Sequence, residues 1–285
     1  MTPPTRADPG RPGPVAKRTR FGWVGELAVL SGIYFSYDLL RDHVAGPTHV
    51  AFQHAKQIVA AERFLHLYWE RDIQRAFLHI DWFIAFWNIY YGTVHFVVPV
   101  VALIWIYRKM PARYVRWRTT LVLMFALAVL SFWVYPLMPP RVMPARYGFV
   151  DTAAQYYNFG PQVRIRLDAK GRPDHEDVEQ FGNLYAAMPS FHVGWSTWSV
   201  LALWPLVRRR GAKLLLVLYP LTILFCITVT ANHWLLDAVG GWAVLGLGYS
   251  GARGVEWGLA AIRSRRGLSP PPSASRAATS APVDA

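Results

Sequence analysis

Residues 213–231 read KLLLVLYPLTILFCITVTA, and residues 233–252 continue with HWLLDAVGGWAVLGLGYSGA, so two apolar runs follow one another almost without interruption. Each run is close to the length of about 20 residues that an α-helix needs to cross the hydrocarbon core of a bilayer. Similar runs recur along the chain and give six candidate spans in total, at 22–40, 82–107, 119–138, 190–207, 213–231 and 233–252. We therefore expect an all-α fold, a six-helix transmembrane bundle.

The composition supports a single membrane domain. The chain has 285 residues, of which 53% are hydrophobic, and its one cysteine, Cys226, lies inside an apolar run and excludes an intrachain disulfide. No small-residue cleavage site follows the first run, which we interpret as a retained anchor. Residues 1–20 and 267–285 are rich in proline with arginine or serine, a composition typical of disordered tails. Residues 21–266 then form the membrane domain.

The distribution of basic residues predicts the orientation. The net charge of +13 comes mainly from segments between apolar runs, a pattern that favours contact with an anionic membrane surface over nucleic acid binding. Basic residues concentrate in the N-terminal tail and after the second, fourth and sixth runs, around 108–118, 208–213 and 253–266. Six crossings place these segments on one side, which the positive-inside rule makes cytoplasmic. We expect a multi-pass plasma membrane protein with both termini in the cytoplasm.

Two connecting segments on the opposite side carry patterns of their own. Residues 44–78 contain shorter apolar patterns broken by charges, which predict one or two amphipathic helices on the outer interface or, alternatively, a helical hairpin that covers the bundle. Residues 145–187 form a long outer loop, a length that suits a lid or binding element as well as a passive connection.

Three polar islands lie at the edges of apolar runs: Pro139-Pro140-Arg141, Met188-Pro189-Ser190-Phe191-His192 and His233-Trp234-Leu235-Leu236-Asp237. Ionisable groups at the edge of a span are costly and are therefore candidates for function. Under the predicted orientation all three islands fall at the outer face of the membrane. This agreement predicts one composite site.

His233 and Asp237 are four residues apart and share a face of a helix. A carboxylate there can accept a hydrogen bond from one imidazole nitrogen and leave the other nitrogen as a basic, oriented lone pair. Such an imidazole is a nucleophile or a general base. An isolated pair of this kind also occurs as a self-satisfied polar contact at a helix start.

The other two islands supply groups that bind or protonate a phosphate. Pro189 and Ser190 open a helix whose free N–H groups, with the Ser190 hydroxyl, form an anion site. His192 lies close enough to give a proton to a leaving oxygen. Arg141 emerges after two prolines that end the third span, and its planar fork matches two phosphate oxygens. Taken singly, an ordinary helix cap and an arginine reaching the lipid headgroups explain the same residues.

Within the second span, Asn88, Tyr91 and His95 fall on one helix face. Polar residues inside a membrane tend to face the bundle interior or a cavity, so these side chains are candidates for a headgroup pocket. Interhelical hydrogen bonding is the alternative, which the pattern slightly favours for Asn88.

Together the Pro-Pro-Arg, Pro-Ser-Phe-His and His-x-x-x-Asp motifs resemble the type 2 phosphatidic acid phosphatase superfamily, and Phe191 makes the middle motif most similar to the branch of fungal inositol phosphorylceramide synthase. The resemblance implies transfer of a lipid phosphate through a phosphohistidine, without a metal or other cofactor. It assigns His233 as the nucleophile, Asp237 as its orienting partner and His192 as the proton donor. Arg141 and Ser190 then hold the phosphate oxygens.

The chain departs from the general pattern of that superfamily at two cations. Val134 stands where a lysine is expected and Ile227 where an arginine is expected. Arg146, Arg164 or Arg166 from the outer loop are candidate replacements. A pocket with fewer cations is compatible with a phosphotransferase, in which an alcohol such as inositol takes the place of water.

Two other classes of function compete with the enzyme. A transporter or lipid-binding protein would use the polar islands as a path, but transporters place ionisable groups nearer the membrane midplane. A zinc site would use His95, His192, His233 and Asp237, provided that the histidines find partners for their other nitrogens. The motifs favour the enzyme, with a membrane lipid phosphate as substrate and neither metal nor nucleic acid as partner.

Overall fold

The computed structural model describes residues 22–44, 46–153 and 183–267. The tails predicted to be disordered lie outside these ranges, except for Gly267. By their contacts, the described residues between 36 and 257 form one compact unit, and residues 22–35 with 258–267 belong to a second. All contacts described below lie within residues 36–257.

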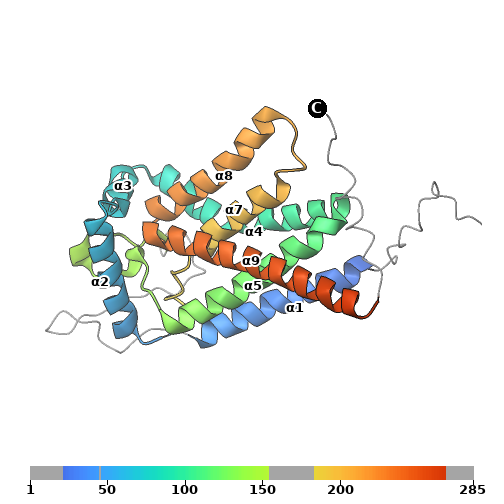
Figure 1. Cartoon of the computed structure of the whole chain (residues 1–285). Coiled ribbons are helices and arrows are strands. Elements are labelled where there is room, and N and C mark those ends of the chain that lie inside the picture. Colours follow the sequence, from blue (N-terminus) through green and yellow to red (C-terminus); the bar gives the residue numbers. More distant parts are fainter. Residues whose placement is uncertain (1–21, 45, 154–182, 268–285) are drawn as a thin grey trace, which may run out of the picture. The chain divides into compact units, whose positions relative to one another are not determined.

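Helices and short 3-10 turns are the regular elements of the described residues, and no strand occurs among them. The one β-type contact there is an isolated bridge between Leu137 and Ala186. The all-α fold is therefore confirmed for the described part of the chain (Figure 1). The elements are α1 (Gly22–His43), α2 (Thr48–Phe64), α3 (Glu70–Phe77), α4 (Asp81–Lys109), α5 (Pro111–Val134), the short 3-10 turns η1 (Pro140–Val142) and η2 (Ala145–Tyr147), α7 (Phe191–Leu203), α8 (Arg210–Val229) and α9 (Leu235–Arg265).

Three of the six expected spans are long and apolar enough to cross a membrane: α4, α5 and α8. Only 22% of the apolar window of α4 and 28% of that of α8 are buried, so most of their apolar surface needs an apolar environment outside the protein. Helices also occupy the other three predicted positions, but α7 has only 13 residues. Six crossings remain a prediction.

The third span ends earlier than the apolar run predicts. Helix α5 stops at Val134, and Tyr135 at its C-cap has left the helical conformation, with φ −136° and ψ 67°. Pro136 explains this end, because a proline disfavours the α conformation of the residue before it and has no N–H to continue the ladder. Residues 135–139 then run outside any helix toward Arg141, instead of ending the span at residue 138.

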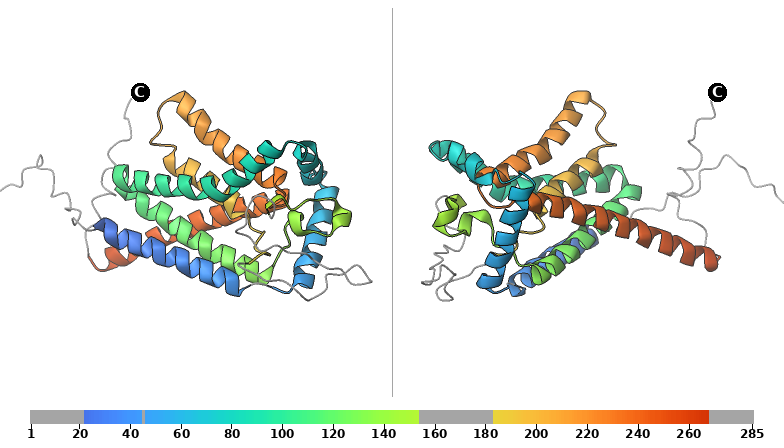
Figure 2. Two further views of the ribbon diagram at one scale, coloured as in Figure 1. Left: turned by 180° about the vertical axis from the view of Figure 1, so that it is seen from behind. Right: turned by 60° about the vertical axis from the view of Figure 1, so that its left-hand side comes forward.

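Segment 44–78 contains two helices, α2 and α3. The sequence predicted either one or two interfacial helices or a helical hairpin that covers the bundle. Helix α2 buries Ala51, Phe52 and Ala55 in a cluster that also contains Leu137 and Trp234. In Figures 1 and 2 both helices lie beside the beginning of α9. This packing agrees with the alternative in which the segment covers the bundle, and it brings α2 and α3 next to the polar islands.

Glycines let α7 and α9 approach closely. A Cβ placed on Gly241 would lie 2.4 Å from the Ser190 carbonyl oxygen and 3.2 Å from the Gly194 nitrogen. Small residues at such a crossing are common in membrane helix packing. Because Ser190 caps α7 and Gly241 follows Asp237 by one helical turn, this contact sets the distance between two of the polar islands.

Candidate active site

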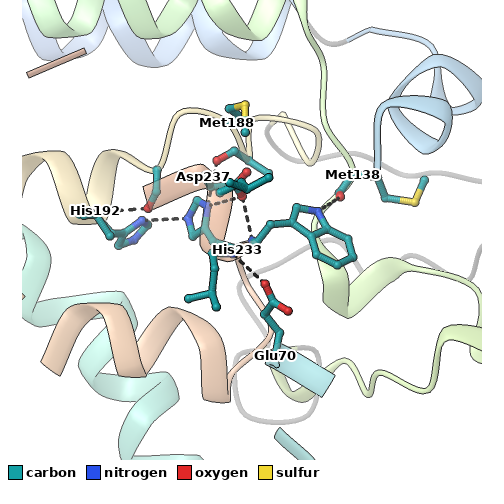
Figure 3. A network of polar contacts seen from close by, with 12 residues as sticks. Glu70, Met138, Met188, His192, His233 and Asp237 are labelled. Atoms are coloured by element: carbon teal, nitrogen blue, oxygen red, sulfur yellow. Dashed lines mark hydrogen bonds and ion pairs between the residues drawn. The ribbon is translucent and has the colours of Figure 1, made fainter. Parts of the chain in front are cut away.

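Hydrogen bonds between loops bring the three polar islands together, as Figure 3 shows for part of the network. The Arg141 N–H donates to the Ala231 carbonyl at 2.8 Å, and the Trp234 indole donates to the Met138 carbonyl at 2.9 Å. The third island joins through the Ser190 N–H, which donates to the Asp237 carbonyl at 2.9 Å. The convergence that the motifs predict is therefore present in the folded chain.

His233 is held by two oxygens on one side of its ring. Its Nδ1 lies 2.9 Å from the Ala187 carbonyl and 3.3 Å from Asp237 Oδ2. Both partners are acceptors, so Nδ1 carries the proton and Nε2 keeps a lone pair. Asp237 is itself fixed, because Oδ2 also accepts the Trp234 N–H at 2.9 Å. The expected orientation of the imidazole by a carboxylate is thus observed, with a carbonyl added.

His192 faces the lone pair of His233. The His192 Nδ1 lies 3.2 Å from His233 Nε2, and the ring centroids are 5.2 Å apart. The tautomer of His233 makes His192 Nδ1 the donor in this contact. Tyr91 stacks on His192 with centroids 4.1 Å apart, and the His95 ring centroid lies 4.2 Å from that of His192. Aromatic rings from α4 therefore fix the plane of His192.

A cavity of ≈ 180 Å³ opens in front of the two imidazoles. Two arginines, Arg41 at the end of α1 and Arg141 after α5, are among its lining residues. Arg141 is oriented by Asp151, whose two oxygens lie 3.1 and 2.9 Å from Nη1. Its Nε is buried and has no hydrogen-bond partner among the described residues. The full lining comprises Tyr37, Arg41, Tyr91, Phe132, Pro139, Arg141, Asn183, Leu184, Ala186, Ala187, Phe191, His192, Asn232 and His233.

Four predicted residues do not line this cavity: Asp237, Ser190, Asn88 and His95. Asp237 is fully buried and acts on His233 from outside the cavity. The Ser190 hydroxyl accepts the Val193 N–H and caps α7. Asn88 donates to the Ile84 carbonyl of its own helix and to the Thr152 hydroxyl. His95 contacts the Tyr91 carbonyl through Nδ1, and its ring lies next to the ring of His192, with the centroids 4.2 Å apart. A phosphate-binding role for Ser190 stays a prediction.

Neither of the two positions where cations were expected lines the cavity. Val134 is 64% exposed, whereas the Ile227 side chain is buried in an apolar cluster and its carbonyl accepts the His233 N–H at 3.4 Å. Arg146 lies over the rings of Phe52 and Tyr147 and does not line the cavity. Arg164 and Arg166 lie outside the described residues.

Sequence reasoning missed Arg41, Asp151 and the Ala187 carbonyl. Arg41 follows the first apolar run directly, so the predicted orientation already places it on the side of the polar islands. That signal was sufficient to include it as a candidate. Asp151 and Ala187 carry no pattern that separates them from other loop residues.

No group of three or more His, Cys, Asp or Glu side chains in the described ranges is arranged to hold a metal ion. Of the four residues named for a zinc site, His192 and His233 contact each other through Nδ1 and Nε2. The arrangement offers a nucleophilic nitrogen, a neighbouring proton donor and two cations around one small cavity. Groups of this kind perform phosphoryl transfer by positioning and charge stabilisation.

A family model described as the PAP2 superfamily matches residues 56–251, which is more than half of the chain. The matched region contains His192, His233 and Arg141, whereas Arg41 precedes it. Neither a curated protein nor a solved structure matches the chain.

Proposed function

The chain is a member of the PAP2 superfamily, and on that premise we propose that it removes or transfers the phosphate-containing headgroup of a membrane lipid through a phosphohistidine on His233. The family supports a phosphatase-type enzyme that acts on a phosphate ester, and α4, α5 and α8 support association with a membrane. The finer assignments below rest on the geometry of the cavity.

In the proposed complex Arg41 and Arg141 bind the phosphate oxygens. Their guanidinium groups form charge-assisted hydrogen bonds that suit a phosphate, and Asp151 presets the direction of Arg141. The buried Nε of Arg141 gains an acceptor when the phosphate enters. Arg41 takes the place of the cations that the superfamily pattern expects at Val134 and Ile227.

The reaction has two steps. His233 Nε2 attacks phosphorus, the bond from phosphorus to the leaving oxygen breaks, and His192, which enters the reaction as an imidazolium beside the phosphate dianion, gives one proton to that oxygen and becomes neutral. An acceptor hydroxyl then returns a proton to His192 while its oxygen attacks phosphorus, and the phosphorus–nitrogen bond breaks to restore His233. Asp237 and the Ala187 carbonyl hold the Nδ1 proton and stabilise the positive ring. Entry of the phosphate separates the two rings, because their 3.2 Å contact leaves no space for phosphorus.

The proposed site faces the extracytoplasmic side. It lies at the N-terminal ends of α7 and α9 and beyond the C-terminal end of α5. The basic residues Arg108 and Lys109 end α4 at the junction with α5, and Arg209 and Arg210 lie where α8 begins. These basic turns occupy the other ends of the helices that carry the site, so the positive-inside rule places the cavity outside.

The hydrogen-bonded orientation of His233 carries this proposal. The test is turnover by the purified protein in detergent of phosphatidic acid, phosphatidylinositol and polyprenyl phosphates, with and without EDTA or vanadate. We expect activity that survives EDTA, is inhibited by vanadate and is lost in His233→Ala. His79→Ala, which removes an exposed histidine outside the cavity, is the matched control. Normal turnover in His233→Ala would reject the assigned nucleophile.

The same assay identifies the acceptor. We propose an alcohol such as inositol as the acceptor, on the resemblance of the Pro-Ser-Phe-His motif to the inositol phosphotransferase branch. Added inositol then diverts the product from free phosphate to an inositol phosphoester. Release of free phosphate at an unchanged rate makes water the acceptor and the protein a phosphatase. Lipid binding with no turnover of any of these substrates favours the non-catalytic alternative.

A further inference from the structure

Two glutamates that the proposed reaction does not use lie fully buried beside the nucleophile. Glu62 comes from α2 and Glu70 from α3, and both are 0% exposed. Glu70 Oε1 accepts the Leu235 N–H at 2.8 Å, and Glu62 Oε1 accepts the Leu236 N–H at 2.9 Å. Figure 3 shows Glu70 on the far side of this turn from His192.

Together with Asp237, these side chains satisfy three consecutive N–H groups at the start of α9. The Trp234 N–H donates to Asp237, the Leu235 N–H to Glu70 and the Leu236 N–H to Glu62. The first N–H groups of a helix have no partner within the helix, and carboxylates are favourable there. Helix caps are usually local in sequence, whereas here two of the three caps come from helices far away along the chain, at separations of 165 and 174 residues.

Two negative charges on Glu62 and Glu70 would be costly, because both side chains are buried and the charges would repel each other. The Oε2 atoms of both are buried and have no assigned hydrogen-bond partner in the described ranges. Burial and the charge of Glu70 raise the pKa of Glu62 to about 10, and Asp237 adds to the effect. Burial also raises the pKa of Glu70, an effect that the hydrogen bond from the Leu235 N–H opposes. A proton on Glu62 therefore removes the repulsion between the two carboxyl groups at neutral pH.

We propose that Glu62 and Glu70 are positioning residues, a carboxyl pair with one shared proton that clamps the first turn of α9 and so holds His233 and Asp237 toward the cavity. The role assigned to His233 rests on the proposed function. The clamp itself rests on the hydrogen bonds to Leu235 and Leu236. It also ties the covering helices α2 and α3 to the nucleophile, so a shift of either helix shifts the first turn of α9.

Two variants of Glu62 distinguish a hydrogen-bonding role of this side chain from a role in packing alone. Glu62→Gln keeps a carbonyl oxygen for the Leu236 N–H and an N–H group for Glu70, so it imitates the protonated side chain. Glu62→Ala removes both. We expect kcat to fall by about 10- to 100-fold in Glu62→Ala with KM little changed, as for a reacting group displaced by about 1 Å. Glu62→Gln should keep kcat close to that of the wild type. In the wild type, kcat should fall at alkaline pH when Glu62 loses its proton, and in Glu62→Gln this fall should move to higher pH.

Hydrogen–deuterium exchange supplies a readout that needs no turnover. Amides of the first turn of α9 should exchange faster in Glu62→Ala than in the wild type and should stay protected in Glu62→Gln. Glu256→Ala, which removes a partly exposed glutamate paired with Arg116 and Arg253 near the other end of α9, is the control and should change neither kcat nor this protection.

Equal protection in Glu62→Ala and the wild type would overturn the clamp, and so would a Glu62→Gln variant that loses as much protection as Glu62→Ala. Failure of the proposed function has a different signature. In that case the wild type and Glu256→Ala both lack turnover, and the exchange measurement still decides whether the pair holds the turn.

Discussion

Replacing Gly241 by alanine tests how strictly the crossing of α7 and α9 sets the active site. The added Cβ would lie 2.4 Å from the Ser190 carbonyl oxygen, whereas a carbon–oxygen contact is comfortable at about 3.3 Å. The obstacle is backbone and cannot rotate away. The two helices must therefore separate by about 0.9 Å at this point, the difference between the comfortable carbon–oxygen distance and the observed one.

This separation acts on the site directly. Ser190 precedes Phe191 and His192, and its N–H is bonded to the Asp237 carbonyl, so widening the crossing moves His192 away from His233. A misplacement of about 1 Å costs on the order of 100-fold in rate. Overpacking adds a loss of about 1–3 kcal/mol in the free energy of unfolding. We expect Gly241→Ala to fold with a lowered Tm and to lose about 100-fold in kcat.

Gly246→Ala is the matched control on the same helix. Nothing lies within 4 Å of a Cβ at Gly246, so the substitution should leave kcat unchanged and stabilise the helix by up to about 1 kcal/mol. The assay is lipid phosphate turnover and thermal unfolding of both variants in the same detergent. A folded Gly241→Ala with the kcat of Gly246→Ala would refute the argument that this contact positions the two imidazoles.

Three other substitutions probe the same geometry. Asp237→Asn should lower kcat by roughly 100-fold or more, because an amide no longer stabilises the positive ring of His233, and single-turnover kinetics check this result. Arg41→Ala should lower kcat/KM by about 10- to 100-fold, the equivalent of one charge-assisted hydrogen bond, with partial recovery in Arg41→Lys; an unchanged kcat/KM would remove Arg41 from the phosphate site. Glu62 holds a proton in the folded state up to a pH of about 10, whereas in the unfolded chain its pKa returns to the ordinary glutamate value of 4.5. The contribution of Glu62 to the free energy of unfolding is therefore fully present below pH 4.5 and is lost as the pH rises toward about 10, with a slope of up to about 1.4 kcal/mol per pH unit. Unfolding measured between pH 5 and pH 10 should show this slope in the wild type and a flatter one in Glu62→Gln; equal slopes would contradict the raised pKa of Glu62.

The apolar runs and the motif spacing made much of the molecule predictable. Long apolar stretches predicted helices at six positions, and a helix occurs at each, although only three of these helices are long and apolar enough to cross a membrane. The His-x-x-x-Asp spacing predicted the contact between Asp237 and His233, which is present. The predicted helix face is not, because α9 begins at Leu235 and His233 lies in the turn before it. The predicted orientation put His192 and Arg141 on the same side of the membrane, and both residues line the same cavity.

Apolar periodicity and motif spacing do not predict contacts that are made by loops or between distant segments. The Ala187 carbonyl contacts His233 Nδ1, and because every residue has a backbone carbonyl, the sequence does not indicate which one forms this bond. The Ser190 hydroxyl suits both an anion site and a helix cap, and only the direction of the side chain toward Val193 distinguishes them. Glu62 and Glu70 resemble surface charges of amphipathic helices until their bonds to Leu235 and Leu236 are seen.

The proposed reaction depends most directly on His233 as the carrier of phosphate between donor and acceptor. The decisive measurement is to mix the enzyme with a lipid labelled in its phosphate, stop the reaction within one turnover under alkaline conditions, and locate the label by peptide mass spectrometry. We predict phosphate on Nε2 of His233 in the wild type, a greater amount when the acceptor is withheld, and none in His233→Ala. Turnover that proceeds with the label on another residue, or with no labelled protein at any time, would contradict this role of His233.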